Sequence, residues 1–246
     1  MSQSSAALHS TPQVTIVDEI TAFGPWFHNL HLPDGTQTAP YHPLGDFPTS
    51  QWQQLRVHIP PDLRGWTVLD IGCNAGFYSF ELAKRGGRVT GIDSDPRSIN
   101  QARWAARQYG LEEHVTFRQM QVYDLAHTAE TFDLVLFMGV VYHLRYPTLA
   151  LDIVAQRVAR LLIFQPLVMA EKAVHERRDW GEAPQTTQLA CRWLRRMASE
   201  ESTGGDQPIG WIPNQTSIEP LLRASGLQIT QTLDQEIYLC TPTPDC

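Results

Sequence analysis

The apolar and polar positions follow two alternating patterns from about residue 51 onward. Short apolar runs, typical of buried strands, lie at residues 66–71, 88–93, 114–118, 132–138 and 161–164. Apolar residues with helical spacing lie at residues 51–58, 77–85, 95–109 and 148–160. Strands that alternate with helices predict a parallel sheet with helices on both faces, which is the doubly wound α/β architecture.

The alternation is interrupted after residue 167 and returns near the C-terminus. Residues 168–213 are charged and rich in Trp, Arg and Gly, so we expect an insertion there that forms a lid over the strand ends. Part of this insertion has the spacing of one helical face, with Leu189, Trp193 and Met197. A further helix and two strands are predicted at 217–225, 227–230 and 237–241. The predicted sheet is therefore Rossmann-like and mostly parallel, with seven strands.

Composition divides the chain into three parts. Residues 1–12 are small and polar, and we expect a disordered tail. Residues 13–63 are rich in aromatic residues, His and Pro, and we expect an N-terminal cover segment packed against the main domain. Residues 64–246 are predicted to form that main domain together with the lid insertion at 168–213. A chain of 246 residues is long enough for one domain with a sizeable core and such additions.

The charge and the cysteine content limit the partners and the compartment. The formal net charge of -7 repels a phosphate backbone on average, which disfavours a nucleic-acid partner. The four cysteines form no C-x-x-C pair, and the N-terminus lacks a basic region followed by an apolar core. The longest nearly apolar run, residues 134–142, is too short to span a bilayer. We therefore expect a cytoplasmic protein that does not enter a membrane.

A glycine-rich turn follows the first strand of the predicted sheet. Gly72 and Gly76 permit a tight turn between this strand and the next helix, and Asp70 comes just before them. The run Gly72-Cys-Asn74-Ala-Gly76 differs from the G-x-G-x-x-G fingerprint of dinucleotide sites. Because open α/β sheets bind ligands beyond the carboxyl ends of their strands, we expect a cofactor on this turn.

Acidic and aromatic residues follow the next strands at the same predicted edge. Asp93 comes 23 positions (93 − 70) after Asp70, where a carboxylate can accept hydrogen bonds from both ribose hydroxyls or can cap a turn; Ser94 lies beside it. Asp124 can accept from the amino group of adenine, and Tyr123 can pack on the ring face. The positive sulfonium of S-adenosyl-L-methionine suits acidic strand ends better than a pyrophosphate does.

These residues resemble the class I S-adenosylmethionine-dependent methyltransferases, through VLDIGCNAG at 68–76, FDLVL at 132–136 and the acidic strand ends. The resemblance implies S-adenosyl-L-methionine as the cofactor. It also implies which residues hold each part: Gly72, Asn74 and Gly76 the methionine, Asp93 the ribose, and Asp124 the adenine. Asn74 stands in place of the middle glycine of the family turn, and asparagine is well able to hold a positive φ.

A narrower resemblance is to the bacterial tRNA wobble-uridine (mo5U34) methyltransferase family, through FMGVVYHLRYP at 137–147 and WIPN at 211–214. It implies that Met138 and Tyr142 contact the cofactor. Characterised members of that family hold a carboxylated cofactor with a Lys before the turn and an Arg in a C-terminal extension. This chain has no Lys before Lys84 and no Arg after Arg223. The difference favours ordinary methyl transfer over carboxymethyl chemistry.

Candidate residues for the acceptor lie outside these motifs or at their edge. His143 is suited by its position and by the pKa range of imidazole to take a proton from a hydroxyl, or it is bound structurally to its loop. Trp26 and His28 are candidates for a cover over the pocket. Arg192 is a candidate for binding an anionic acceptor, with a solvated helix face as the alternative. His28 and His31 have no third ligand at a fixed spacing, so no metal site is predicted.

The sequence thus predicts a methyltransferase that acts on a hydroxyl or similar nucleophile of a small-molecule or sugar-containing acceptor. One alternative is a tRNA wobble-uridine methyl or carboxymethyl transferase, which the net charge disfavours. The other is a non-enzymatic scaffold that binds the cofactor. Methyl transfer is an in-line displacement, so placement of the acceptor and exclusion of water supply most of the acceleration. No oligomeric state is predicted.

Overall fold

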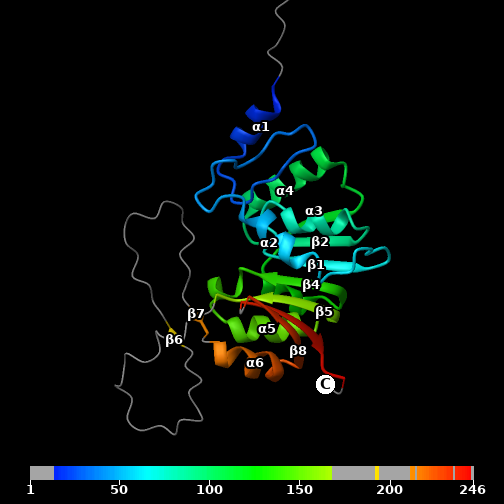
Figure 1. Ribbon diagram of the computed structural model, residues 1–246, viewed down its shortest axis with the longest axis vertical. Coiled ribbons are helices and arrows are strands. Elements are labelled where there is room, and N and C mark those ends of the chain that lie inside the picture. The colour runs from blue at the N-terminus through cyan, green and yellow to red at the C-terminus, as the bar shows by residue number, and fades with distance from the viewer. Residues whose placement is uncertain (1–13, 168–191, 194–210, 214, 235, 245–246) are drawn as a thin grey trace, which may run out of the picture.

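The computed structural model describes residues 14–167, 192–193, 211–213, 215–234 and 236–244 (Figure 1). A seven-stranded sheet runs through its middle in the order β3-β2-β1-β4-β5-β9-β8. Strands β1 to β5 are parallel, and β9 is antiparallel to both of its neighbours. The strands span Thr67–Ile71 (β1), Arg88–Asp93 (β2), Val115–Gln119 (β3), Phe132–Met138 (β4), Val158–Gln165 (β5), Leu227–Leu233 (β8) and Ile237–Pro242 (β9). The predicted Rossmann-like sheet is confirmed.

Helices cover both faces of the sheet (Figure 1). α2, α3 and α4 pack on one face, and α5 and α6 pack on the other. The helices span Ile16–Ala22 (α1), Phe47–Leu55 (α2), Phe77–Ala83 (α3), Pro96–Tyr109 (α4), Pro147–Ala155 (α5) and Gln215–Ala224 (α6), with short 3-10 helices at Val122–His127 (η1) and Val141–His143 (η2). The strand order reverses between β1 and β4, and open α/β sheets bind ligands beside such a reversal.

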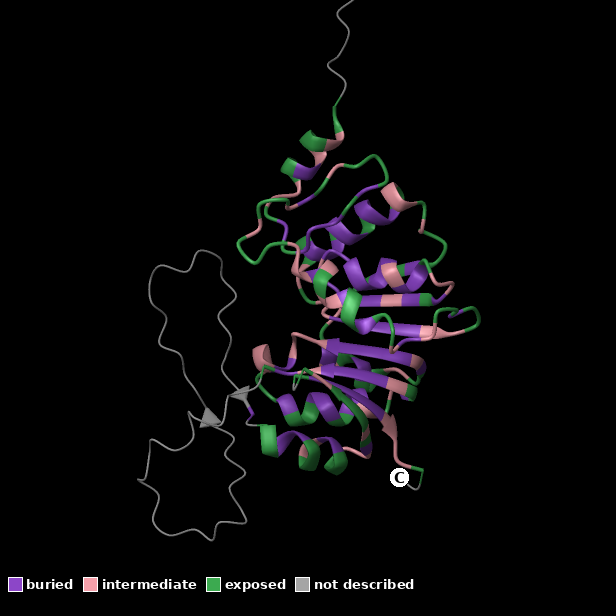
Figure 2. Cartoon of the chain, viewed as in Figure 1, coloured by how far each residue is buried: buried purple, intermediate pink, exposed green. Residues whose placement is uncertain are grey.

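Successive residues of the central strands face opposite cores, which explains their near-continuous apolar sequence. In β4, Leu134 and Leu136 pack on the side of α3 and α4. Val135 and Phe137 pack on the side of α5 and α6. All four are buried, and the central strands are mostly purple in Figure 2. A strand in a parallel sheet needs apolar side chains on both faces because helices cover both.

The segment before α2 lies against α4. The ring of Trp26 packs edge-on against Trp104 with 5.6 Å between centroids. The Trp26 Nε1 donates a hydrogen bond of 2.9 Å to the carbonyl of Ile20 in α1. The side-chain amide of Gln101 in α4 donates one of 3.0 Å to the carbonyl of Pro25. Packing and hydrogen bonds together therefore anchor this segment on the outer side of α4.

The largest differences from the predicted helix boundaries lie in α5 and α2, each for a local reason. α5 ends at residue 155 and β5 begins at Val158, so the predicted helix at 148–160 is too long. The amide of Phe132 donates to the carbonyl of Arg157 at 2.8 Å, and this pairing with β4 overrides the helical spacing of the sequence. α2 begins at Phe47 rather than at residue 51, because a proline suits the first turn of a helix.

The predicted helix in the insertion is also wrong where it can be compared. Arg192–Trp193 forms strand β6, which pairs with β7 at Trp211–Ile212. The other two residues of the expected face, Leu189 and Met197, lie outside the described residues, as do the predicted tail at 1–12 and most of the insertion. No helix within the described ranges is long and apolar enough to cross a membrane.

Candidate functional site

The glycine-rich turn is held in a left-handed conformation directly after β1. Gly72, Asn74 and Gly76 have φ values of 71°, 49° and 89°, so Asn74 adopts the positive φ expected from the sequence. The amides of Gly72 and Cys73 both donate to the carbonyl of Ile92 in β2, at 2.8 and 3.0 Å. The turn is therefore tied to the end of the neighbouring strand.

Neighbouring side chains approach two glycines of the turn too closely for any larger residue. A Cβ atom on Gly72 would lie 2.3 Å from Cγ2 of Val140, and one on Gly76 would lie 2.9 Å from the rings of Phe80 and Phe117. The missing side chains therefore let Val140, Phe80 and Phe117 pack directly on the backbone of the turn. Sequence reasoning did not identify Val140, because no pattern in the sequence shows that residues 72 and 140 are in contact.

Asp93 joins the turn to the helix that follows β2. Its Oδ2 accepts a hydrogen bond of 2.9 Å from the amide of Asn74, and its Oδ1 accepts one of 2.9 Å from the amide of Asp95. The capping role considered for Asp93 is therefore real. Each carboxylate oxygen has a second lone pair, so the same group can also accept from a ribose. Ser94 is exposed beside it at the end of the strand.

Asp70 lies beneath the turn and faces α3. It is only 3% exposed, and its Oδ2 accepts a hydrogen bond of 2.6 Å from the hydroxyl of Ser79. Burial raises the pKa of Asp70 to about 6; the Ser79 hydrogen bond lowers the pKa and the nearby Asp93 raises it. Asp70 thus ties β1 to α3, and its predicted contact with the cofactor stays a prediction.

The predicted adenine partners lie in η1, after β3. Oδ2 of Asp124 accepts a hydrogen bond of 2.9 Å from the amide of Gln121, which caps the short helix, and Asp124 is exposed. The hydroxyl of Tyr123 accepts one of 3.0 Å from the amide of Tyr146. Tyr123 therefore connects the ends of β3 and β4. Tyr146 was not identified from the sequence as a site residue.

The residues after β4 lie beside the turn as well. Met138 ends the strand, Val140 touches Gly72, and the rings of Tyr142 and His143 pack with 4.4 Å between centroids. Both rings are half-buried. The structure thus brings these predicted residues to the same edge of the sheet as the glycine-rich turn.

The other three acceptor candidates lie in different surroundings. Trp26 is buried in the packing against α4, so its ring anchors the N-terminal segment. His28 is buried too, and its ring contacts those of Phe77 and Tyr78 at centroid distances of 6.2 and 5.8 Å. Burial, assisted by the charge of nearby His42, lowers the pKa of His28 to about 3. Arg192 lies in the two-residue strand β6.

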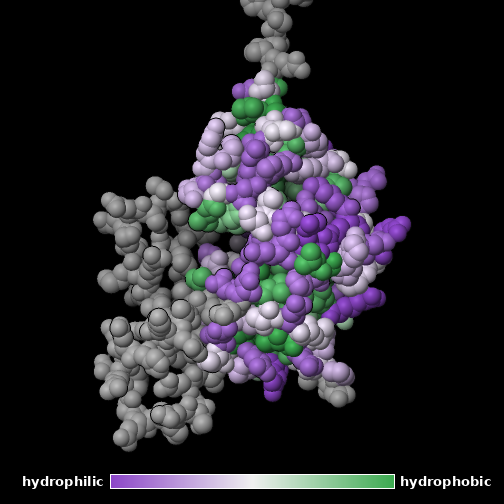
Figure 3. All heavy atoms as spheres, viewed as in Figure 1, coloured by the Kyte–Doolittle hydropathy of each residue, from purple (hydrophilic) through white to green (hydrophobic). Residues whose placement is uncertain are grey.

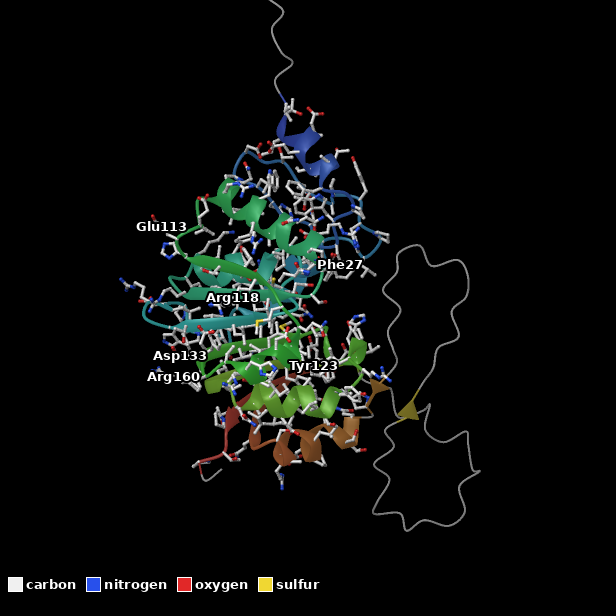
Figure 4. The ribbon with its side chains drawn as sticks, turned by 180° about the vertical axis from the view of Figure 1, so that it is seen from behind. Phe27, Glu113, Arg118, Tyr123, Asp133 and Arg160 are labelled. Atoms are coloured by element: carbon white, nitrogen blue, oxygen red, sulfur yellow. The ribbon has the colours of Figure 1, made fainter. Side chains whose placement is uncertain are left out.

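Figure 4 shows the carboxyl and the amino ends of the parallel strands on opposite sides of the molecule. Phe27 and Tyr123 are labelled on the side of the carboxyl ends of the strands. Asp133 and Arg160, whose ion pair is 2.9 Å long, lie on the side of the amino ends. The polar residues predicted from strand ends therefore gather at one edge, and a structural ion pair occupies the other.

A cavity of about 210 Å³ lies away from this edge, on the outer side of α3. Its walls include Trp52, Phe77 and Tyr109. The charged groups in its lining, Glu81 and Lys84, are paired with each other at 2.6 Å, and the Lys84 ammonium also lies 4.8 Å from the Tyr109 ring. Because these two charged groups are paired with each other, the cavity has fewer polar groups for binding a cofactor than the strand ends have.

Neither metal nor thiol chemistry is indicated by the described part of the chain. No group of three or more His, Cys, Asp or Glu residues is placed to hold a metal ion there. Cys73 lies within the glycine-rich turn but is buried, and burial raises the pKa of its thiol well above the usual value. A thiol that stays protonated is a poor nucleophile.

Part of the chain is similar to known methyltransferases. Residues 68–163 match the family model described as "Methyltransferase domain". The ubiquinone biosynthesis O-methyltransferase of Cereibacter sphaeroides is 42% identical over 91 residues, which are 37% of this chain and 36% of that protein. The tRNA U34 carboxymethyltransferase of Pseudoalteromonas translucida is 35% identical over 125 residues, which are 48% of this chain and 37% of that protein. The chain thus matches less than half of the length of these relatives.

Solved structures share the fold over most of the chain. The N-terminal domain of EvdMO1, in the presence of SAH and D-fucose, superposes with a TM-score of 0.64 at 18% identity, covering 92% of this chain and 94% of that one. Magnesium protoporphyrin IX methyltransferase from Synechocystis PCC 6803 with bound SAM has a TM-score of 0.54 at 17% identity, covering 80% and 78%. At this level of identity the likeness shows the fold.

Proposed function

Because the chain carries a methyltransferase domain on a class I methyltransferase fold, we propose that it is an S-adenosyl-L-methionine-dependent methyltransferase. It acts on a hydroxyl or similar nucleophile of a small-molecule or sugar-containing acceptor. The described cysteines Cys73 and Cys240 are free, which supports a reducing, cytoplasmic location.

The observation that carries this proposal is the link between Asp93 and the glycine-rich turn. The Asp93 carboxylate accepts from the amide of Asn74, so it is fixed beside the left-handed turn that contains Gly72 and Gly76. A nucleoside at this edge of the sheet meets a carboxylate for its ribose hydroxyls and a tight glycine-containing turn for its amino-acid part. The fit supports an adenosyl amino acid better than a dinucleotide, whose pyrophosphate would lie close to Asp93.

The chain's residues have separate tasks in the proposed reaction. When bound, the cofactor supplies an electrophilic methyl group. We assign the adenine to Tyr123 and Asp124, and the reacting end to Met138 and Tyr142 after β4. His143 accepts the proton that a hydroxyl loses as its oxygen attacks, and the N-terminal segment helps to exclude water.

The proposed acceptor class rests on the net charge of the chain and on the names of its relatives. The net charge of -7 opposes binding of a polyanion, and the relatives include proteins named as ubiquinone biosynthesis O-methyltransferases. The alternative acceptor is tRNA, which the relatives named as tRNA U34 carboxymethyltransferases favour. Retention on tRNA that weakens steeply with salt would support that alternative. A non-enzymatic scaffold would bind the cofactor without turnover.

Isothermal titration calorimetry with S-adenosyl-L-methionine tests the proposal. We expect the wild type to bind. Asp93→Asn should weaken binding at least about tenfold, because each hydrogen bond to a charged group contributes about 1.5 kcal/mol or more. Asp95→Asn is the matched control, since Asp95 is the N-cap of α4 in the same loop and asparagine caps equally well. Absence of binding by the wild type, or equal affinity of Asp93→Asn, would refute the cofactor assignment.

A further inference from the structure

Two groups of aromatic residues flank the glycine-rich turn. One comprises Phe27, His28, His42 and Phe47, which we call the N-terminal ledge. The other comprises Tyr123, Tyr142, His143 and Tyr146, which we call the η2 ledge. The first group reaches the turn through Phe77, the residue after Gly76, and the second through Val140, which touches Gly72.

The N-terminal ledge presents an aromatic ring to solvent from a rigid support. Phe27 contacts His42 and Phe47 with centroid distances of 5.3 and 5.2 Å, yet its side chain is 48% exposed. The backbone beneath it is fixed, because the hydroxyl of Thr38 donates a 3.0 Å hydrogen bond to the carbonyl of His28. Figure 3 shows an apolar patch on the N-terminal part of the molecule, above a hollow at this edge.

The η2 ledge has the same two properties. Tyr146 is 54% exposed, and its ring lies 6.4 Å from that of Tyr123 at an angle of 68°. Its amide donates to the Tyr123 hydroxyl, and Pro147 follows it at the start of α5. The Arg145 guanidinium lies 5.6 Å from the Tyr146 ring centroid. Contacts to two neighbouring elements thus hold Tyr146, although its ring is open to solvent.

Exposed aromatic rings on fixed backbone are suited to binding another ring. Aromatic faces and edges attract flat π systems beyond the effect of buried area, and this attraction is lost with a saturated ring of the same size. Exposed apolar groups beside a candidate active site are typical of ligand-binding surfaces. The two ledges therefore favour a flat aromatic acceptor over an aliphatic one.

The chemistry of the reacting hydroxyl points the same way. A phenol has a pKa of about 10 and an imidazolium ion one of about 6.5. The equilibrium constant for proton transfer from the phenol to the imidazole is therefore smaller than one by between three and four powers of ten. An aliphatic hydroxyl resembles water, with a pKa of about 15.7. For this group the equilibrium constant of the same proton transfer is smaller than one by about nine powers of ten. A histidine base at this edge is therefore suited to a phenolic hydroxyl.

We propose that the acceptor is a planar aromatic compound with a ring hydroxyl, which contacts the exposed rings of Phe27 and Tyr146 and loses its hydroxyl proton to His143. The step forms the bond between the acceptor oxygen and the methyl carbon and breaks the bond between that carbon and the cofactor sulfur. The sulfur keeps the electron pair and becomes a neutral thioether, and the proton leaves on the imidazole. The proposal rests on the proposed function and narrows its acceptor.

Binding of matched probes in the presence of S-adenosylhomocysteine tests this proposal. The probes are naphthalene-2,3-diol and decalin-2,3-diol, which have similar outlines but differ in aromaticity. Calorimetry should show binding of the aromatic diol and little or none of the saturated one. Phe27→Ala and Tyr146→Ala should each weaken the aromatic diol about two- to tenfold, the range that corresponds to one aromatic contact.

Controls separate this proposal from the function on which it rests. Tyr41→Ala removes a ring that is 96% exposed in the same N-terminal segment, and it should leave binding unchanged. Phe27→Ala and Tyr146→Ala should bind S-adenosylhomocysteine as the wild type does. His143→Gln should bind the aromatic diol normally but lose transfer of a labelled methyl group to it.

The outcomes that overturn the proposal are distinct. If S-adenosylhomocysteine fails to bind the wild type, the proposed function itself is refuted. If it binds but the two diols bind equally, or neither binds, the aromatic acceptor is refuted while the cofactor assignment stands. Methyl transfer to tRNA with no transfer to the diol would likewise overturn it, because the rings would then stack on bases.

Discussion

Substitution of Gly72 by alanine isolates the close contact that shapes the candidate cofactor turn. The new Cβ would lie 2.3 Å from Cγ2 of Val140, and the residue has a φ of 71°. A positive φ costs an alanine about 1 to 2 kcal/mol, and overpacking costs about 1 to 3 kcal/mol more. We therefore expect Gly72→Ala to lower the free energy of unfolding by about 2 to 5 kcal/mol and to abolish calorimetric binding of S-adenosyl-L-methionine.

Gly65→Ala is the matched control for this substitution. Gly65 has a φ of 83°, but a Cβ there would meet no atom within 4 Å. Its cost is the backbone strain alone, about 1 to 2 kcal/mol, and cofactor affinity should not change. The loss of unfolded-state entropy is the same in both variants and cancels in the comparison.

A double variant then tests whether Val140 is the cause. Val140→Ala removes the Cγ2 atom, so in this background Gly72→Ala should cost no more than Gly65→Ala in urea denaturation. If Gly72→Ala were no more destabilising than Gly65→Ala in the wild-type background, the contact between the turn and the residues after β4 would be refuted.

Three further predictions concern buried or partly buried polar groups. His28→Leu should leave thermal stability unchanged or raise it, because the buried Nδ1 of His28 has no hydrogen-bond partner among the described residues; a clear loss of stability would show a partner. Burial raises the pKa of Asp70 to about 6, so the protonated carboxyl group contributes fully to the free energy of unfolding below about pH 4, and this contribution is lost as the pH rises through 6. In urea titrations between pH 4 and 7, the free energy of unfolding of Asp70→Asn should therefore rise relative to that of the wild type by up to about 3 kcal/mol. A parallel pH dependence of the two proteins would contradict this. Tyr123→Phe removes the hydroxyl that accepts from the Tyr146 amide but keeps the ring, so it should destabilise the protein by about 1 kcal/mol and raise KM for the methyl acceptor. An unchanged KM would separate Tyr146 from the acceptor site.

The central strands and the turn could be predicted from the sequence because their signals are local. The strands β2 and β4 have the predicted bounds, since each is a short apolar run between polar residues. The helix α4 also has predictable ends, with Asp95 as its N-cap and Gly110 in the left-handed conformation after it. Glycines at fixed positions after a buried strand likewise identified the turn.

The contacts that shape the site could not be predicted, because they join residues that are far apart in sequence. Nothing in the local pattern shows that Val140 rests on Gly72, or that the Tyr123 hydroxyl accepts from the Tyr146 amide. The helical spacing of residues 189–197 was misleading at Arg192 and Trp193, since β6 gains its pairing from β7 almost twenty residues later. Trp26 shows the same limit: its aromatic neighbours suggested a pocket, and its ring packs on α4 instead.

The central claim is that the cofactor lies on the glycine-rich turn at the carboxyl edge of the sheet. A crystal structure of the protein with S-adenosylhomocysteine tests it most directly. We predict density for the ribose hydroxyls within hydrogen-bond distance of Asp93, with the amino-acid end over residues 72–76. Density in the cavity on the outer side of α3, or a ribose without contact to Asp93, would contradict the account.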